Sequence, residues 1–408
     1  MIRIILVLNL SILLNISHAQ ISGCTDPIAI NYNEQATRND GTCVYDAVTV
    51  TPVKSWILPE SMFESSGLIL WNNKIWTHND NTDINLYAFE TDELNNYKEY
   101  PVAGALNIDW EEISQDSNYI YVGDFGNNSN GNRTNLQILR IEKNSILTDK
   151  PDVDTISFSY SLQTDFSATG NNNTDFDCEA FIVTADSIFL FTKEWVSKRS
   201  SVYSLPKVPG NYVARYRTSF NVEGLISGAT YMEKGKLVVL CGYSSLLQPF
   251  LYLLYDFNKN DFFSGNKRKI LINLPFHQVE GIATNDGLMY YISNEKLDQA
   301  ITIDQKLHQV DLSDYLEDFL NTTKTDNISV LKELEIYPNP SSSIVTVKVN
   351  TDLTGEYYSI IDLSGKNIFT HQIDEEVFQI NLNDFDKGFY LFVLKSPKKL
   401  ITRKIVKN

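Results

Sequence analysis

The chain has 408 residues and a formal net charge of −17, and 43% of its residues are hydrophobic. This length allows two or three domains, each with enough apolar residues for a packed core. So negative a charge argues against nucleic-acid binding, because a face that binds nucleic acid must be basic to displace counterions. The 22 Tyr and 21 Phe against 4 Met favour β-sheet, since aromatic side chains suit a pleated surface.

The N-terminus has the pattern of a signal peptide. A short basic start is followed by an apolar stretch from Ile4 to Ile16, and Ser17-His18-Ala19 supplies small residues for cleavage. We therefore expect residues 1–19 to be removed. The apolar stretch is too short to span a bilayer, and no later segment approaches the ~20 apolar residues of a spanning helix. Ile21-Ser22-Gly23-Cys24 has the letters of a lipoprotein cleavage box, which leaves lipidation as an alternative.

Residues 20–46 resemble a short module of secreted bacterial proteins with the pattern GCTDPxAxNYxxxAxxxDGxC. The resemblance implies a disulfide between Cys24 and Cys43, worth about 3 kcal/mol on the chain-entropy estimate. So small a module could hardly stay folded without it. The Asp and Asn residues between the cysteines either bind calcium or cap turns, and turn chemistry alone accounts for them. These residues are Asp26, Asn31, Asn33 and Asp40.

Residues 50–312 repeat a phrase in which a Glu precedes small and apolar residues. Two or three further strand patterns follow each phrase, with a period of roughly 45–65 residues, which is typical of propeller blades. The five phrases are Glu64-Ser-Ser-Gly, Trp110-Glu111-Glu112, Cys178-Glu179-Ala180, Val222-Glu223-Gly224 and Val279-Glu280-Gly281. We predict an all-β chain with a five-bladed β-propeller; a degenerate sixth blade could lie in the longer second unit.

Closure of the ring is predicted from a leftover strand. The last unit lacks a fourth strand, whereas Val53–Leu58 precedes the first Glu without a unit of its own. Donating this strand to the last blade would remove the open sheet edges. The alternative is a β-sandwich in which Glu recurs by accident.

The Glu side chains are the first candidate site. The first strand of each blade lines the central channel, so the five Glu would form a carboxylate ring there. Two carboxylates 6 Å apart repel by ~3 kcal/mol at an effective dielectric near 20. The ring therefore needs protons, a cation or bonds to backbone N–H groups. Two D-x-E patterns put two acids on one face of a strand and favour calcium over zinc. The candidate ligands are Glu111, Glu179, Glu280, Asp109 and Asp177.

A second candidate site lies at one rim of the predicted ring. The second strands end in polar clusters that should gather there, and such a mixture suits a binding cleft. His78 is the best general-base candidate, with Asp80, Asp124 or Glu194 as its partner. The G-x-S-x-G, H-E-x-x-H, phosphate-loop and Rossmann motifs are missing. Cys178 and Cys241 either pair across the channel mouth or remain buried thiols.

The E-G-[IL] and D-x-E-[AG] phrases resemble those of the SdiA-regulated and esterase-like-phytase groups of β-propellers. Glu179, Glu223 and Glu280 match best, whereas Glu111 departs because Glu112 replaces the small residue. The resemblance implies calcium binding and hydrolysis of phosphate esters by carboxylates and basic residues. Basic residues near the predicted rim are few, which argues against hydrolysis. They are Arg133, Lys193, Lys198 and Arg199.

The C-terminal residues predict an export signal. Residues 313–333 are expected to be a linker with one helical turn at Tyr315–Leu320. Residues 334–408 combine a Tyr-Pro-Asn-Pro opening, a Leu-Ser-Gly-Lys turn and a Gly-Phe-Tyr-Leu-Phe strand. In these features they resemble the C-terminal sorting domain of type IX secretion substrates. The resemblance implies a small β-sandwich, export by the type IX machinery, and a secreted or cell-surface location.

The predicted function is a surface propeller that binds an extracellular glycan or peptide, with calcium as its candidate ion. The alternative is a calcium-dependent phosphoester or ester hydrolase, and a purely structural or adhesive role is a third reading. Whether the mature protein is released or anchored is left open.

Overall fold

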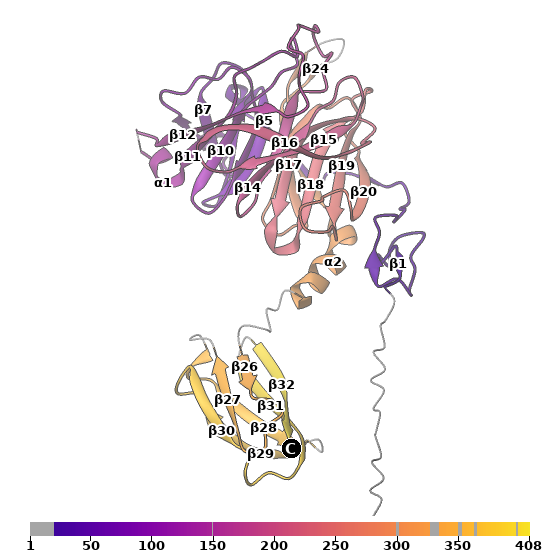
Figure 1. Ribbon diagram of the computed structural model, residues 1–408. Helices are drawn as coiled ribbons and strands as arrows, with labels where there is room; N and C mark the ends of the chain where they lie inside the picture. The colour runs from indigo at the N-terminus through magenta and orange to yellow at the C-terminus, as the bar shows by residue number, and fades with distance from the viewer. Residues whose placement is uncertain are drawn as a thin grey trace, which may run out of the picture. The chain divides into compact units, whose positions relative to one another are not determined.

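The computed structural model describes residues 20–148, 150–298, 302–326, 334–349, 353–362, 365–396 and 399–408 (Figure 1). The predicted signal peptide, residues 1–19, lies outside the described residues. The chain divides into two compact units, one that ends at Glu317 and one that spans Asp318–Asn408.

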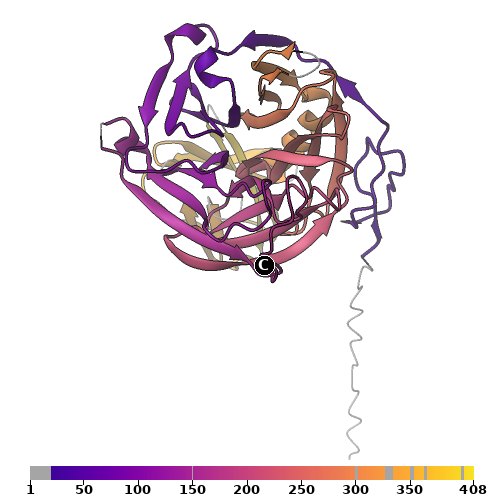
Figure 2. The same cartoon turned by 90° about the horizontal axis from the view of Figure 1, so that it is seen from above.

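The first unit is a five-bladed β-propeller (Figure 2). Each blade is a sheet whose neighbouring strands run antiparallel, and its first strand lies next to the axis. The first blade consists of β5 (Ser65–Trp71), β6 (Lys74–Asn79), β7 (Asn85–Phe89) and β8 (Lys98–Pro101). The second consists of β9 (Trp110–Gln115), β10 (Tyr119–Asp124), β11 (Leu136–Glu142) and β12 (Val153–Tyr160). The third consists of β13 (Cys178–Val183), β14 (Ser187–Thr192), β15 (Ser200–Pro206) and β16 (Gly210–Phe220). The last two consist of β17 (Leu225–Met232), β18 (Leu237–Tyr243), β19 (Pro249–Tyr255) and β20 (Asn266–Ile272); and β21 (Val279–Thr284), β22 (Met289–Asn294), β25 (Lys306–Asp311) and β4 (Lys54–Ile57).

Burial explains why the inner strands are apolar on both faces. Neighbouring blades cover both sides of β14 and β18, and Ile188–Thr192 and Leu237–Tyr243 are buried without a break. The outermost strand β20 instead alternates buried and half-buried residues, as expected for a strand with one wet face. The sequence of each blade therefore changes from continuous to alternating hydrophobicity with distance from the axis.

The N-terminal strand closes the ring, as predicted. β4 pairs antiparallel with β25, and Trp56 lies opposite Leu307. In the described residues the longer second unit contains no sixth blade; its extra length forms the connection 161–177 between β12 and β13. A feature that was not predicted is the parallel pairing of β12 with β16, which joins the second and third blades into one eight-stranded sheet.

The remaining elements of this unit are short. They are β1 (Ser22–Gly23), β2 (Arg38–Asn39), β3 (Thr49–Val50), β23 (Leu297–Asp298), β24 (Thr302–Ile303), the helix α1 (Lys143–Ile146), and the 3₁₀ turns η1 (Glu60–Met62), η2 (Leu94–Asn96) and η3 (Glu233–Gly235). β3 extends the sheet of the fourth blade by pairing with β20.

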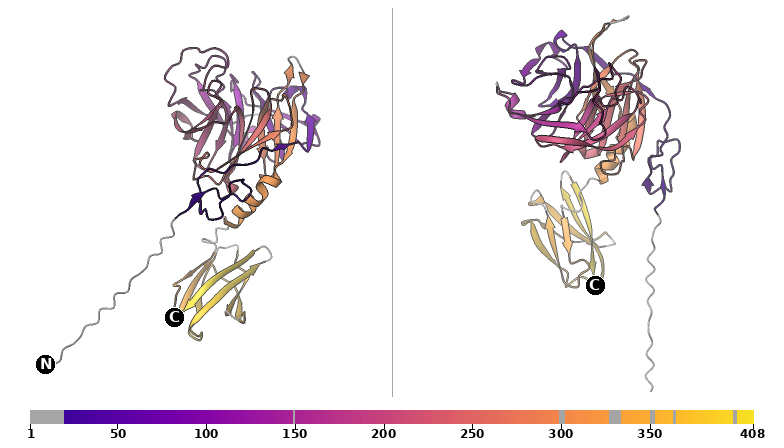
Figure 3. Two further views of the ribbon diagram at one scale, coloured as in Figure 1. Left: turned by 90° about the vertical axis from the view of Figure 1, so that its right-hand side faces the viewer. Right: turned by 45° about the horizontal axis from the view of Figure 1, so that its top comes forward.

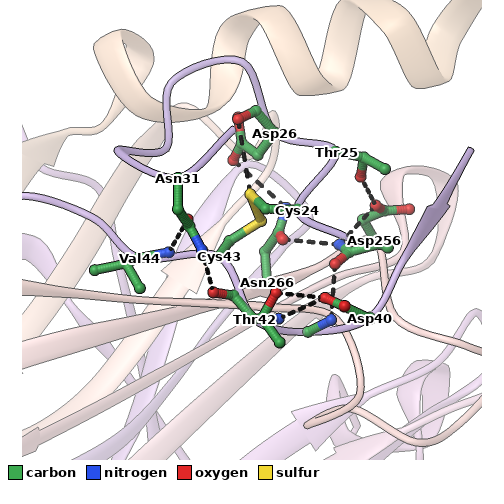
Figure 4. Close-up of a disulfide and its surroundings, with 12 residues drawn as sticks. Cys24, Thr25, Asp26, Asn31, Asp40, Thr42, Cys43, Val44, Asp256 and Asn266 are labelled. Atoms are coloured by element: carbon green, nitrogen blue, oxygen red, sulfur yellow. Dashed lines mark hydrogen bonds between the residues drawn. A yellow bond between two sulfur atoms is a disulfide. The ribbon is translucent and has the colours of Figure 1, made fainter. Parts of the chain in front are cut away.

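The small N-terminal module contains the predicted disulfide between Cys24 and Cys43 (Figure 4). Its Asp26 carboxylate is buried and accepts hydrogen bonds from Tyr45 Oη at 2.7 Å and from Tyr255 Oη of the fourth blade at 2.6 Å. Asp40 accepts hydrogen bonds from Thr42 at the end of a turn. These acids therefore dock the module and cap its turns, as the turn interpretation predicts.

The predicted linker, residues 313–333, begins with the α-helix α2 (Ser313–Asp326), which is longer than the single expected turn. Leu316 and Leu320 are buried, so tertiary packing supports this helix beyond what its polar sequence indicates. Residues 327–333 lie outside the described residues.

The C-terminal domain is the predicted β-sandwich. One sheet has the order β26-β27-β30 and the other β29-β28-β31-β32. A core that includes Val345, Val347, Ile360 and Phe392 lies between the sheets. The strands are β26 (Leu334–Tyr337), β27 (Ile344–Val349), β28 (Tyr357–Asp362), β29 (Asn367–Gln372), β30 (Val377–Asn381), β31 (Gly388–Ser396) and β32 (Lys399–Lys407).

Ring closure can be tested with two truncations. A chain that starts at Pro52 lacks the disulfide module and β3 and keeps β4, whereas a chain that starts at Leu58 lacks β4 as well. We expect the first to melt a few degrees below the mature chain. The second should melt lower still and aggregate, because it exposes the edge of β25. Thermal melting followed by light scattering measures both, and equal behaviour of the two truncations would contradict the closure.

Candidate functional site

One end of the ring gathers the candidate residues. Successive strands of a blade are antiparallel, so the loops that precede each innermost strand and those that join second to third strands share one end. We call this end the upper face. β23 and β24 project from it, and α2 begins at the opposite end (Figures 1 and 3).

Every innermost strand carries a β-bulge near its start. In four blades a single residue is left without a partner on the second strand, and in the first blade Ser66 and Gly67 together oppose one residue. A bulge bends the strand and re-aims one side chain. The equivalent bulge residues in ring order are Ser66, Glu111, Glu179, Ser227 and Glu280.

Two of the five Glu predicted to form a ring lie elsewhere. Glu223 precedes β17, is exposed and has a φ of 51°. Glu64 precedes β5, is half-buried and accepts a hydrogen bond from Asn81 Nδ2 at 2.6 Å. The prediction of five equivalent Glu was therefore wrong, because a Ser-Gly pair and not a Glu occupies the bulge in the first and fourth blades, and in the fourth blade this pair lies after the predicted phrase.

Close approach of the inner strands explains those Ser-Gly pairs. A Cβ on Gly281 would lie 2.3 Å from the carbonyl oxygen of Ser66, and one on Gly228 would lie 2.3 Å from that of Glu280. The residue after the bulge must therefore be small wherever the neighbouring strand comes this close.

Glu112 occupies this position in the second blade. It is fully buried, and its carboxylate accepts hydrogen bonds from Ala229 N at 2.7 Å and from Ile113 N at 2.9 Å. Burial raises the pKa of Glu112 well above its ordinary value, although these N–H bonds oppose the shift. Glu112 thus links the second blade to the fourth across the axis, a structural role that was not predicted from the sequence.

Three predicted ligands form one compact group. Glu111, Asp177 and Glu179 each offer a carboxylate oxygen, and these atoms lie within 4.8 Å of one another. All three residues are buried, and Asp177 also accepts hydrogen bonds from Asn127 N at 2.6 Å and Trp195 Nε1 at 2.7 Å. We call Glu111, Asp177 and Glu179 the carboxylate triad.

Asp109, the fourth predicted ligand, borders the triad. A Cβ on Gly126 would lie 2.1 Å from Glu111 Oε1 and 2.4 Å from Asp109 Oδ2, so glycine is needed for both carboxylates to approach this loop. Arg133 Nη1 lies 4.0 Å from Asp109 Oδ2.

Glu280, the fifth predicted ligand, belongs to the last blade and lies near Asp80 and Glu295, because burial and then repulsion from Glu280 raise the pKa of Glu295, and Glu280 also contributes to the raised pKa of Asp80. Glu280 is buried, and its Oε2 has no hydrogen-bond partner among the described residues. Asp80 and Glu295 are half-buried at the ends of the loops above it. We call Asp80, Glu280 and Glu295 the second acidic group.

One buried lysine faces both groups. Lys193 Nζ lies 3.1 Å from Glu179 Oε1, and the rings of Trp195 and Tyr243 lie 5.0 and 5.2 Å from it. Burial alone would lower the pKa of Lys193, but Glu179 and Glu280 outweigh it and raise this pKa well above the ordinary value. Lys193 therefore stays charged and neutralises only part of the surrounding negative charge.

The carboxylates respond to burial and to one another. Burial, followed by repulsion from neighbouring acids, raises the pKa values of Glu111 and Asp177 well above the usual range. The same causes raise the pKa of Asp80 to about 8 and that of Asp109 to about 6. Without a cation, several of these groups hold protons at neutral pH.

The structure does not bring the predicted base and its partners together. His78 is buried, its ring lies edge-on to Trp110 at 5.9 Å, and burial lowers its pKa to about 4. Asp124 pairs with Arg133 at 2.9 Å, and Glu194 accepts a hydrogen bond from Thr192 at 3.0 Å. His78 thus lies in the interior of the first blade, away from the solvent that a general base has to serve.

Cys178 and Cys241 are buried free thiols, the second of the two alternatives left open by the sequence. Burial raises the pKa of Cys178, which makes this thiol unreactive.

Comparison with known proteins identifies the C-terminal domain. Residues 335–408 match the family model described as "Secretion system C-terminal sorting domain". The prediction of a type IX sorting domain is confirmed, and this domain implies interaction with the type IX secretion machinery. The protein is exported and is secreted or located at the cell surface. No described helix is both long and apolar enough to cross a membrane. No curated protein matches the chain.

Solved structures are similar to the chain only at low identity. One similar structure is that of PorZ, an essential bacterial surface component of the type IX secretion system of Porphyromonas gingivalis. It is 13% identical to this chain with a TM-score of 0.31. The match covers 84% of this chain and 45% of PorZ, so this chain spans less than half of the length of PorZ. A chain of the Mitotic Checkpoint Complex is 9% identical with a TM-score of 0.35, over 66% of this chain and 97% of the other. A protein of unknown function from Dyadobacter fermentans has the same identity and TM-score, over 64% and 98%. Likenesses this weak say nothing about ligand or activity, and the resemblance to SdiA-regulated and phytase-like propellers stays a prediction.

Replacing Lys193 tests whether it is the built-in counter-ion. Lys193→Met should destabilise the protein by about 3–5 kcal/mol at pH 8, because Glu179 then stays buried without a partner. The folded-state pKa of Glu179 is already raised and would rise further, so the lost stability should return as the pH falls and the carboxylate takes up a proton. Urea unfolding at several pH values measures this. A loss that is the same at pH 5 and pH 8 would contradict the role.

Proposed function

We propose that the protein is an exported surface propeller that binds an extracellular ligand at its upper face, with calcium held by the carboxylate triad. The observation that carries the proposal is the convergence of three buried carboxylate oxygens within 4.8 Å. A protein that binds its ligand through a fixed scaffold benefits from an ion that ties separate blades together. Glu111 belongs to the second blade, and Asp177 and Glu179 belong to the third.

The donor set favours calcium among the divalent cations. Calcium takes six to eight oxygen ligands at 2.3–2.6 Å, so oxygens on opposite sides of the ion are about 5 Å apart. The spacing of the triad fits this range. Zinc would favour nitrogen and sulfur ligands, and in the described residues the group contains no His or Cys.

Surrounding residues would complete the site. Asp109 lies against the same Gly126 as Glu111 and is partly open to solvent, so it could supply a further oxygen. A doubly positive ion would also replace the protons that Glu111 and Asp177 otherwise hold, since it stabilises the ionised form of each carboxylate.

A pair of matched substitutions tests calcium binding. Glu179→Gln removes a triad carboxylate, whereas Glu223→Gln removes the acid of the same sequence phrase that lies outside the triad. We expect the mature chain and Glu223→Gln to retain calcium and to melt several degrees lower in EDTA. Glu179→Gln should lose both the ion and the EDTA effect. Metal analysis after dialysis and thermal melting measure these outcomes. If no metal co-purifies and EDTA leaves the melting temperature unchanged, the proposal is wrong.

The pH dependence without metal gives an independent test. Asp80 has a folded-state pKa of about 8, above its ordinary value of 3.8, so the stability that its proton contributes is lost progressively as the pH rises from about 4 to about 8. In EDTA we expect the melting temperature to fall between pH 6 and 8 and to level off above pH 8, and Asp80→Asn should reduce this fall. Thermal scans of both proteins at matched ionic strength measure this fall in melting temperature. An identical fall in Asp80→Asn would contradict the assignment of the raised pKa to Asp80.

Phosphoester hydrolysis is the second candidate function, and Lys193 inside the acidic cluster is the observation that favours it. A phosphate-binding cation must be free to meet substrate oxygens, however, and Lys193 pairs with Glu179 while Arg133 pairs with Asp124. We therefore expect no turnover of p-nitrophenyl phosphate by the calcium-loaded protein. Turnover that disappears in Glu179→Gln and persists in Glu223→Gln would establish the hydrolase instead.

A further inference from the structure

The upper face combines negative charge with exposed apolar side chains. Seven exposed large apolar residues of the described propeller loops lie on loops of this face, whereas three, Val53, Leu147 and Val208, lie at the opposite end. The most exposed of the seven are Leu246 at 80%, Leu106 at 71% and Val196 at 60%; the others are Leu162, Phe276, Ile108 and Phe166. Apolar side chains concentrated at one end of a soluble propeller mark an interaction surface.

Most of the acids at this face have no ion-pair partner. Among the described residues, the ion pairs near the channel are Lys193 with Glu179 and Arg133 with Asp124 and Asp109. The members of the second acidic group form none, even though Glu280 is 96% buried in the channel with its Oε2 lacking any hydrogen-bond partner. Lys193 acts on Glu280 but is paired with Glu179, and Oε2 of Glu280 still has no hydrogen-bond partner among the described residues, so this oxygen points to a further cationic group that is supplied from outside.

Lys193 shows how such a group is held at this face. Its ammonium lies 3.1 Å from Glu179 and between two aromatic rings. The second acidic group presents carboxylates in the same channel, and its half-buried members Asp80 and Glu295 leave an approach from solvent.

We propose that the upper face docks a segment of another protein that presents a lysine side chain between apolar residues. The ammonium would meet Asp80, Glu280 and Glu295, and the apolar neighbours would cover the exposed residues of the surrounding loops. The inference rests on the proposed function, because it names the ligand of the same face. It assigns the second acidic group to the partner and leaves the carboxylate triad to calcium.

Two labelled peptides test the inference on the mature chain, residues 20–408. One has a lysine flanked on each side by two leucines, and the other has norleucine in place of the lysine, which keeps the length and removes the charge. We expect the lysine peptide to bind at least about tenfold more tightly in fluorescence anisotropy, the change that a lost charge-assisted contact produces. Equal affinities, or no binding of either peptide, would overturn the inference.

Three variants locate the contact. Asp80→Asn combined with Glu295→Gln should weaken the lysine peptide and leave the norleucine peptide unchanged, whereas Leu246→Ser should weaken both. Glu99→Gln on the outermost strand β8 removes an exposed acid away from the channel and should change neither. An equal effect of Glu99→Gln and the double variant would reduce the binding to overall charge and overturn the inference.

Calcium content is measured on the same samples. If the protein contains calcium but binds the lysine and norleucine peptides equally tightly, this inference is wrong and the proposed calcium site stands. Selective peptide binding by a protein without calcium would support the inference while contradicting the calcium site.

Discussion

The close approach of five innermost strands around one axis is the constraint on which the rest of the structure depends. At the bulge level the backbones of neighbouring blades are so near that Gly228 and Gly281 have no room for a Cβ. The bulge turns the preceding side chain out of the strand pairing. The sequence there consists of one directed side chain followed by a small residue, except in the second blade, where Glu112 follows the bulge. Three of the five blades use that side chain to bring a carboxylate into the channel.

Bringing carboxylates together in a nearly dry space raises their free energy, and the protein lowers it by several separate means. Glu112 accepts backbone N–H groups from two blades, Glu179 pairs with Lys193, and Asp177 accepts an indole and a backbone N–H. Glu111 shares a hydrogen bond with Glu179, and Glu280 interacts with Lys193, Ser227 and Tyr243, yet Oε2 of Glu280 has no hydrogen-bond partner among the described residues. One carboxylate oxygen of the channel, Oε2 of Glu280, is left unpaired among the described residues, and this is the observation from which we propose a cation supplied from outside.

Much of the architecture could be predicted because propeller blades repeat. The period gave the number of blades, and the unpaired strand before the first unit indicated its place beside β25. The site was predicted less well. Glu223-Gly224 and Ser227-Gly228 lie four residues apart in one blade, and only the pairing with β18 shows that the second pair occupies the bulge. The sequence was enough to name Glu111, Glu179 and Glu280 as channel residues and Lys193 as a rim residue. The distances between these side chains could not be predicted, because they depend on the twist of separate blades. His78 was misjudged because a His at the end of a strand gives no sign of whether it faces solvent or the neighbouring blade.

The pairing of β4 with β25 also determines when the fold can be completed. The first strand of the blades to be synthesised waits for a partner roughly 250 residues further along the chain, a contact of very long sequence separation. Until that partner is available, the first and last blades cannot be joined by β4, and the ring of blades stays open at this point. An open ring has a lower barrier to unfolding than a closed one, since blades can peel away from a free end. Any change that keeps β4 away from β25 would therefore leave the edge of the last blade free and make the whole propeller easier to unfold.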